Sequence, residues 1–416
     1  MNKKYSDLLK AIGPGILFAG AAIGGSHLIQ STRAGADYGF SLLIVVIAAN
    51  LFKYPFFEYS YRYTSAKGKS LLEGYADLGG WAIWSFLGIS LVTGIINMAA
   101  LALGSSGLLG YIIGQPVDPL YLSIGLVTFC ILLLIIGKYP LLDKVMKLMV
   151  LILGICTTIA FIMSLSVETN VSPDFVQQNI LEKSGILFLI ALMGWMPAPI
   201  ESSIWTSLWT LGRIKQKNYI PTLRETLIDF HIGYITTTIL AVFFLTLGAM
   251  VMYGSGVGFS PNGTEFSKQV IELYTTLFGK WSVWIIAPAA FITLLSSLLT
   301  VVDAYPRSIT GALFLVSRKI NKFRIYFNVV LMISMAVISI IIVSFFAKDL
   351  KSMMDLATVI SFLAAPVFAF INYKVVTASD FPKDYKPKLW LKILGQLGIV
   401  FLTGFSLIYL WSLFFL

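Results

Sequence analysis

The chain has 416 residues, of which 57% are hydrophobic and only 12% are charged, and its mean hydropathy is +0.85. This composition excludes a water-soluble globular protein, and many apolar runs reach the roughly 20 residues needed to cross a bilayer. The formal net charge of +10 does not require a nucleic-acid partner, because basic loops on one side of a membrane account for it.

Cysteine and histidine are too rare for a disulfide framework or a structural zinc site. The chain has two cysteines, both inside apolar segments, and two histidines that form no cluster with them. We expect no cofactor. We also find no nucleotide-binding glycine loop and no catalytic constellation, so the sequence does not indicate an enzyme.

Hydropathy predicts an all-α polytopic membrane protein with eleven spans. The expected spans, in chain order, cover residues 9–37, 40–63, 80–113, 120–137, 142–167, 185–211, 226–253, 281–304, 325–346, 352–373 and 390–414. Residues 265–278 are expected to form a further, amphipathic helix outside the membrane. The first apolar segment continues without a credible cleavage site, so we expect a span there and not a signal peptide.

Lysine and arginine predict the orientation in the membrane. Loops after even-numbered spans carry basic clusters, for example Arg213, Lys215 and Lys217, whereas loops after odd-numbered spans carry few basic residues. Because basic loops stay in the cytoplasm, we expect the N-terminus inside, the C-terminus outside and a multi-pass location in the cell membrane.

A short repeat relates the first and sixth spans. The tetrapeptide GILF occurs at 15–18 and again at 185–188, and nine residues after each start come residues that disfavour a continuous helix. These are Gly24-Gly25-Ser26-His27 in span one, and Gly194 to Pro199, with two prolines, in span six. Span six starts five spans after span one, so the two halves enter the membrane from opposite sides.

Inverted repeats with paired broken helices are typical of secondary transporters. We therefore predict one transporter domain, 1–416, with inverted repeats at about 9–167 and 185–373 and an extra span at 390–414. Unwound backbone at membrane depth lines a cavity or is buried in protein. The predicted substrate site thus comprises the residues of both breaks: Gly24, Gly25, Ser26, His27, Met196, Pro197 and Ala198.

Several side chains near the breaks are candidates for coupling or metal binding. His27 is a candidate for binding substrate, ligating a metal or carrying a proton, or it hydrogen-bonds to backbone. Met196 is either a soft metal ligand or a packing side chain. Glu201, an ionisable group at membrane depth, is expected to receive a proton or bind a cation, with an internal pair to Arg33 as the alternative. Asp303 is a further coupling candidate, although Arg307, four residues on, favours a helix-surface ion pair.

Residues 13–39 (GPGILFAGAAIGGSHLIQSTRAGADYG), followed by 48–71 (AANLFKYPFFEYSYRYTSAKGKSL), resemble spans one and two of the NRAMP (natural resistance-associated macrophage protein) divalent-metal transporters. Weaker similarity extends through the rest of the chain. The resemblance implies a LeuT-type fold, with five-plus-five inverted repeats and one extra helix, and proton-coupled metal transport by alternating access.

The metal motifs of that family are mostly absent. Its Asp-Pro-Gly-Asn motif corresponds to residues 24–27, and its Met-Pro-His motif corresponds to Met196, Pro197 and Ala198. The glutamine that many members carry in span ten falls at Thr358, which joins the predicted substrate-binding residues. Of the side-chain ligands only the methionine is kept, and no aspartate in the first break neutralises a divalent cation.

The sequence thus predicts an ion- or proton-coupled secondary transporter of a cation, with a metal ion as the family's expectation. The open alternatives are a small organic solute, such as an amino acid or an amine, and a non-transporting membrane sensor on the same fold. The expected partners are a small ion or solute and membrane lipid, with no nucleic acid. Substrate identity, coupling ion and oligomeric state remain open.

Overall fold

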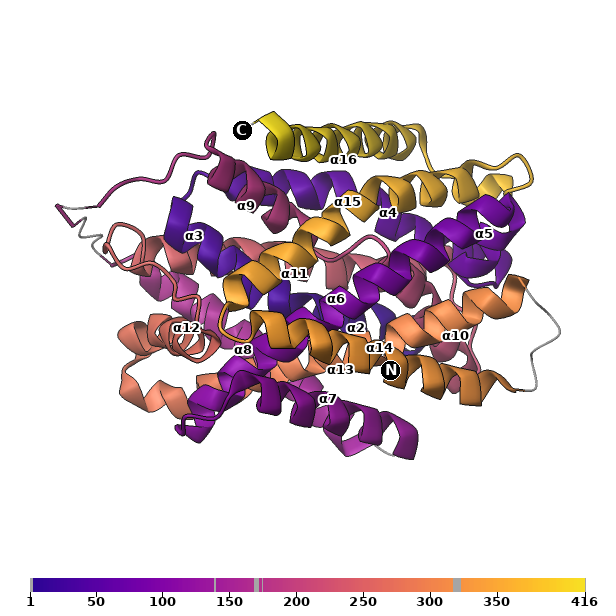
Figure 1. Ribbon diagram of the computed structural model, residues 1–416. Coiled ribbons are helices and arrows are strands. Elements are labelled where there is room, and N and C mark those ends of the chain that lie inside the picture. Colours follow the sequence, from indigo (N-terminus) through magenta and orange to yellow (C-terminus); the bar gives the residue numbers. More distant parts are fainter. Residues whose placement is uncertain (1–2, 138–139, 168–171, 174, 317–322, 416) are drawn as a thin grey trace.

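The structure is a computed structural model that describes residues 3–137, 140–167, 172–173, 175–316 and 323–415. Within these residues the chain is helical and contains no strand. Figure 1 shows most of the helices running along one common direction. Their bounds are α1 Lys3–Ala11, α2 Pro14–Ala22, η1 Ile23–Ser31, α3 Thr32–Tyr38, α4 Leu43–Lys67, α5 Leu71–Leu78, α6 Gly80–Ile113, α7 Pro119–Ile136, α8 Pro140–Ser164, α9 Lys183–Gly194, α10 Ser202–Lys217, α11 Leu223–Val251, α12 Gly263–Phe278, η2 Lys280–Ser282, α13 Val283–Val316, α14 Arg324–Phe346, α15 Leu350–Thr377, η4 Lys383–Tyr385 and α16 Leu389–Phe415.

Eight of the described helices are long and apolar enough to cross a membrane as single helices. They correspond to predicted spans three, four, five, seven, eight, nine, ten and eleven. The other three predicted spans are α2–η1–α3, α4 and α9–α10, which are interrupted or carry charged side chains. The three segments that depart from a plain apolar helix are therefore spans one, two and six. Spans one and six line the cavity described below, and span two carries Lys53, which bonds to the end of α9.

Most predicted span ends lie within a few residues of the observed helix ends, and the predicted amphipathic helix is α12. One end is wrong. Predicted span eight stops at residue 304, but α13 continues to Val316 and includes Pro306. The helix continues because the residues after position 304, among them Tyr305 and Ser308, are buried against the rest of the protein.

The predicted interruption of span six is confirmed. The helix α9 ends at Gly194, and regular helix resumes only at Ser202, the first residue of α10. Pro197 and Pro199 lie between these two residues and have no amide hydrogen to donate to a preceding turn. The Met196–Pro197 peptide bond is cis. A membrane span made of two half-helices results.

The predicted unwinding of span one is wrong. Residues 23–31 form a π-helix, η1, that continues α2 into α3 without a gap. The Ser31 and Thr32 hydroxyls each donate a 3.3 Å hydrogen bond to a carbonyl five residues earlier. Gly24 and Gly25 serve packing here. A Cβ atom on Gly24 would lie 2.1 Å from the Ser297 hydroxyl oxygen, and one on Gly25 would lie 2.5 Å from the Trp195 ring. Such π-helical segments occur frequently at functional sites.

Small residues also allow a close crossing of two helices, α3 with α11. A Cβ atom on Gly35 would lie 1.9 Å from the Leu245 carbonyl oxygen, and one on Gly248 would lie 2.1 Å from the Thr32 carbonyl oxygen. Close backbone approach through small residues is a common way for helices to pack in a membrane. The crossing holds the end of span one against span seven.

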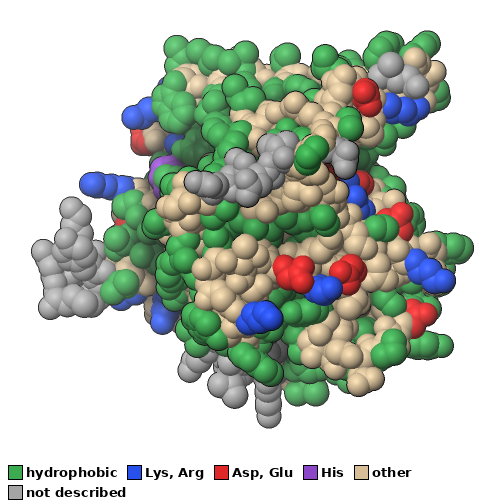
Figure 2. Space-filling model, turned by 90° about the vertical axis from the view of Figure 1, so that its left-hand side faces the viewer, with side chains coloured by type: hydrophobic (Ala, Val, Ile, Leu, Met, Phe, Trp, Pro, Cys, Tyr) green, Lys and Arg blue, Asp and Glu red, His purple; other side chains and the backbone are tan. Residues whose placement is uncertain are grey.

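The two longest described helices, α6 and α13, pack along each other through the centre of the molecule, and α16 lies at the outer edge beside α15 and α4 (Figure 1). Large apolar side chains are exposed on the outward faces of α7, α14 and α16, as expected for surfaces in contact with lipid. Figure 2 views the end of the molecule that carries α12, where acidic and basic side chains lie among apolar ones.

Candidate functional site

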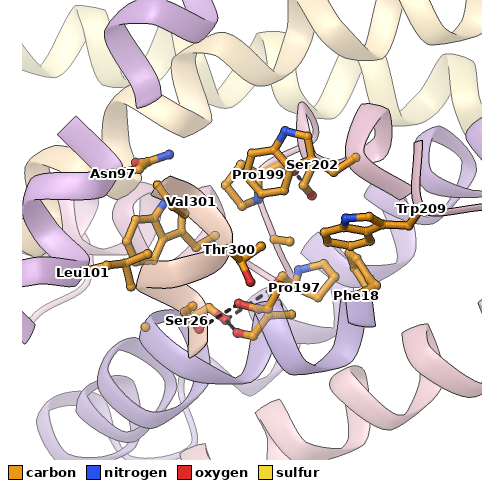
Figure 3. A pocket seen from close by; sticks show the side chains of 17 residues that line it. Phe18, Ser26, Asn97, Leu101, Pro197, Pro199, Ser202, Trp209, Thr300 and Val301 are labelled. Carbon is orange, nitrogen blue, oxygen red and sulfur yellow. Dashed lines mark hydrogen bonds between the residues drawn. The ribbon is translucent and has the colours of Figure 1, made fainter. Parts of the chain in front are cut away.

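A cavity lies where the π-helical part of span one meets the interruption of span six. It encloses about 520 Å³ of empty space, including its opening, between α2–η1, α6, the α9–α10 segment and α13 (Figure 3). Its lining residues are Phe18, Ala21, Ala22, Gly25, Ser26, Asn97, Leu101, Trp195, Pro197, Ala198, Pro199, Ser202, Trp205, Trp209, Ser297, Thr300 and Val301. None of these has an ionisable side chain.

Hydrogen bonds join span one to spans six and eight at the cavity wall. The Ser26 hydroxyl lies 3.2 Å from the Pro197 carbonyl oxygen, and it also bonds to the Ala22 carbonyl oxygen within its own helix. On the neighbouring side, the Ser297 hydroxyl of α13 donates a 3.1 Å bond to the Ala21 carbonyl oxygen. Hydroxyl and carbonyl oxygens of spans one, six and eight therefore face one space.

Four of the predicted substrate-binding residues line this cavity: Gly25, Ser26, Pro197 and Ala198. The other four are buried behind its wall. Gly24 packs directly against the Ser297 side chain. Met196 is fully buried in the apolar core. Their part in binding stays a prediction, because no substrate is bound.

His27, a residue of η1, has its side chain against α11 and does not line the cavity. Its Nε2 is 2.8 Å from the Thr237 carbonyl oxygen, which requires a proton on Nε2. Its Nδ1 is 2.5 Å from the Ser26 hydroxyl oxygen and 3.0 Å from the Ala22 carbonyl oxygen. Both ring nitrogens are thus engaged within the protein. Metal binding or proton transfer by His27, which both stay predictions, would require it to leave these partners.

Thr358 lies in α15 against the end of α9. Its hydroxyl donates 2.8 Å to the Met354 carbonyl oxygen and accepts a 3.3 Å bond from the Gln30 side-chain amide. The contact between the two helices is close, because a Cβ atom on Gly194 would lie 1.8 Å from the Thr358 carbonyl oxygen. The backbone of Thr358 therefore positions the C-terminal end of α9.

A chain of hydrogen bonds leads from the cavity wall to Glu201. The Trp195 indole donates to the Ser361 hydroxyl at 3.1 Å, and Ser361 donates to the Asn97 amide oxygen at 3.2 Å. The Asn97 amide nitrogen donates to the Tyr305 hydroxyl at 2.6 Å, and Tyr305 donates to a Glu201 carboxylate oxygen. Every donor in this chain points toward Glu201, as suits an ionised carboxylate. Sequence reasoning identified Glu201 but missed Ser361, Asn97 and Tyr305.

The suggested pair between Glu201 and Arg33 is wrong. Arg33 binds Asp355 of α15 with both terminal nitrogens, at 2.7 and 3.0 Å, and its Nε lies 3.4 Å from Asp37. Arg33 is in α3, beyond η1, where it faces α15 and not the α9–α10 loop. This two-pronged ion pair joins span one to span ten on the side of the cavity away from the N-terminus.

Sequence reasoning also missed Lys53, a lysine in the middle of α4. Its side chain is fully buried, and its Nζ donates to the carbonyl oxygens of Met193 at 2.6 Å and Gly194 at 2.8 Å. The rule that singled out Glu201, an ionisable residue at membrane depth, applies equally to Lys53 and would have found it.

A wider cleft reaches the cavity from one end of the molecule. It is lined by α1, α2, α7, α8, α10 and α13, and it shares Trp205, Trp209 and Thr300 with the cavity. Asp303 lines this cleft, and the Arg307 guanidinium lies 2.5 Å from its carboxylate, so the expected helix-surface pair is confirmed. The cleft ends near Arg213, on the side that the basic loops assign to the cytoplasm. Among the residues that the structure describes, no group of three or more His, Cys, Asp or Glu side chains could hold a metal ion.

The fold and the central cavity define a multi-pass membrane protein with the inverted-repeat architecture of secondary transporters. The chain belongs to the Nramp family, natural resistance-associated macrophage protein-like, whose family model matches residues 15–412. It is 36% identical over 405 residues to the uncharacterized protein PM0681 of Pasteurella multocida, covering 96% of this chain and 92% of that protein.

Solved transporter structures share the fold. A manganese transporter of Eremococcus coleocola superposes with a TM-score of 0.69 at 16% identity, covering 99% of this chain and 89% of that one. MhsT in complex with L-phenylalanine superposes with a TM-score of 0.63 at 15% identity, covering 96% of this chain and 98% of that one. At these identities the likeness shows the fold alone.

Proposed function

We propose that this chain is a secondary active transporter of the Nramp type that moves a small cation across the membrane by alternating access. One observation carries the proposal: a cavity lined by the π-helix of span one and the interruption of span six lies at the inner end of a cleft that opens to one side. On the other side, the Arg33–Asp355 pair joins α3 to α15. This arrangement suits one state of a carrier that exposes its site to one side at a time.

A metal ion is the first candidate substrate, because the chain belongs to the Nramp family and shares the fold of a manganese transporter. The cavity offers only neutral oxygen ligands, from hydroxyls such as those of Ser26, Ser297 and Thr300 and from backbone carbonyls. Hard cations accept such ligands, and they retain water where a site supplies too few. A soft transition metal would find neither thioether nor imidazole on the cavity wall.

A small organic cation is the second candidate, and the aromatic lining favours it. Four aromatic rings, those of Phe18, Trp195, Trp205 and Trp209, contribute to the wall. Aromatic faces attract amines and quaternary ammonium groups, and tryptophan does so best. Such a ligand needs no carboxylate on the wall.

Coupling is assigned in this proposal to Glu201. This residue is 1% exposed, and the hydrogen-bond chain described above links it to Trp195 and Asn97, both on the cavity wall. A change at the wall on substrate binding would alter the donors that reach Glu201, and thereby its affinity for a proton. His27 and Asp303 remain further candidates for the coupling group.

Uptake into proteoliposomes tests the proposal. The assay offers Mn²⁺, Mg²⁺, choline and L-phenylalanine in turn, with and without an imposed pH gradient. We expect uptake of one cation, which Thr300→Trp abolishes by filling the cavity. The matched control Leu91→Trp places the same side chain on an exposed face of α6 and should leave uptake unchanged. No uptake of any cation, or full uptake by Thr300→Trp, would overturn the proposal and favour a sensor or another path.

A further inference from the structure

Lys53 carries a buried ammonium group that contacts the end of α9, the first half-helix of span six. It belongs to α4, its side chain is 0% exposed, and its Nζ faces three backbone carbonyl oxygens. The distances are 2.6 Å to Met193, 2.8 Å to Gly194 and 3.4 Å to Ala198. A buried lysine without such contacts would be strongly destabilising.

The end of α9 explains why these carbonyls can accept from a cation. The Met193 carbonyl has the Met196 amide as a backbone partner at 3.3 Å, and Gly194 and Ala198 lie at and after the last residue of the helix. The last carbonyls of a helix have no amide partner within the helix and carry the negative end of its dipole. After α9 the chain runs through Pro197 and Pro199, which have no amide hydrogen to offer. A carbonyl group of this kind, at a break in a membrane helix, is where transporters of this architecture bind a free cation.

We propose that the carbonyl oxygens of Met193, Gly194 and Ala198 form a monovalent-cation site and that the ammonium group of Lys53 permanently occupies it. The transporter then needs no free sodium ion at this position. The cation comes from α4, so span two and the first half of span six are joined by it and move as one unit.

The charges around Lys53 support this assignment. Glu201, at the start of α10, is the acidic residue that lies near enough to Lys53 to attract its ammonium group when the carboxylate is ionised. The remaining charged residues near the middle of α4, Glu58 and Arg62, bond to each other and so do not neutralise Lys53. A buried charge that is paired and hydrogen-bonded costs far less than an isolated one.

The test uses the purified full-length protein and its thermal unfolding midpoint, and it does not depend on which solute is transported. Lys53→Ala removes the ammonium and opens space for propylammonium, which replaces the deleted atoms. Lys53→Met removes the charge but fills the space, and Lys53→Gln keeps amide donors without the charge. Each protein is measured with propylammonium, sodium or N-methyl-D-glucamine as the chloride salt, at one ionic strength.

We expect Lys53→Ala to have a lowered midpoint that rises by several degrees, saturably, with propylammonium and to a smaller extent with sodium. The midpoints of the wild type, Lys53→Met and Lys53→Gln should not respond to either cation, and the two variants should stay below the wild type. The proposal is overturned if Lys53→Gln is as stable as the wild type, because hydrogen bonding alone would then suffice. It is also overturned if no small cation stabilises Lys53→Ala, or if that variant yields no folded protein in any of the salts.

Discussion

The side-chain amide of Asn97 donates a 2.6 Å hydrogen bond to the hydroxyl of Tyr305. Asn97 lies on the cavity wall, and Tyr305 in turn donates to Glu201. The two residues come from α6 and α13, the helices at the centre of the molecule. Their bond is the step that connects the wall of the proposed substrate site to the buried carboxylate.

Removing the Tyr305 hydroxyl should isolate that carboxylate. Tyr305→Phe is expected to lower the free energy of unfolding by about 1–3 kcal/mol, because a buried charged acceptor loses its donor. Substrate affinity should change little, since Tyr305 does not line the cavity, whereas the response of uptake to pH should shift. Tyr61→Phe is the matched control. Tyr61 is also buried, and its hydroxyl has no partner among the described residues, so its loss should leave both stability and pH response unchanged.

Glu201→Gln should separate transport from coupling. The neutral amide keeps the shape of the carboxylate but cannot exchange a proton, so an imposed pH gradient should no longer accelerate uptake. Movement of the solute down its own concentration gradient should persist. Glu272→Gln changes an exposed carboxylate of α12 and provides the control. Gradient-driven accumulation by Glu201→Gln at the wild-type rate would assign coupling elsewhere, with His27 and Asp303 as the next candidates.

A methyl group at Gly194 should disrupt the end of α9. The added Cβ would lie 1.8 Å from the Thr358 carbonyl oxygen and 2.6 Å from its carbonyl carbon, and backbone atoms of α15 cannot move aside cheaply. We expect Gly194→Ala to lower the unfolding midpoint strongly, at a cost of about 3 kcal/mol or more. Gly212→Ala in α10 meets no atom within 4 Å and should be neutral or stabilising by up to about 1 kcal/mol. Equal midpoints for the two variants would refute the close α9–α15 contact.

The Arg33–Asp355 pair should be far more important for stability than a surface pair. Arg33→Met leaves the carboxylates of Asp355 and Asp37 without their cation and is expected to cost about 3–5 kcal/mol. Arg33→Lys should rescue only partly, because a lysine cannot make the two-pronged bond. Lys268→Met breaks an exposed pair with Glu265 on α12 and should cost no more than about 1 kcal/mol. Chemical denaturation of the three variants measures the difference, and a cost for Arg33→Met no larger than that for Lys268→Met would contradict this ranking.

Much of the fold could be predicted because bilayer crossing imposes a simple pattern on the chain. Apolar length located the spans, and Pro197 and Pro199 located the interruption of span six, since proline acts through its own covalent structure. Gly24 and Gly25 were misinterpreted for the opposite reason. Whether a glycine breaks a helix or admits a neighbour depends on that neighbour, here Ser297 and Trp195, which lie far away in sequence.

The candidate site could be predicted only in part for the same reason. Residues 24–27 and 196–198 were found because each group is contiguous in the chain. The hydrogen-bond chain joins Asn97, Tyr305 and Ser361, which are ordinary polar residues of three separate helices. No local pattern marks them. Lys53 was detectable, because a lysine within an apolar span is rare and costly.

Labelling of a single cysteine at Thr300 tests the central claim most directly. Thr300→Cys is placed in a protein whose Cys130 and Cys156 are replaced by serine, and a membrane-impermeant thiol reagent is applied from each side in turn. Thr300 lies where the cleft meets the cavity. The account predicts labelling from the cytoplasmic side and protection by a saturating concentration of the transported solute. Labelling from the external side alone, or labelling that the solute leaves unchanged, would contradict it.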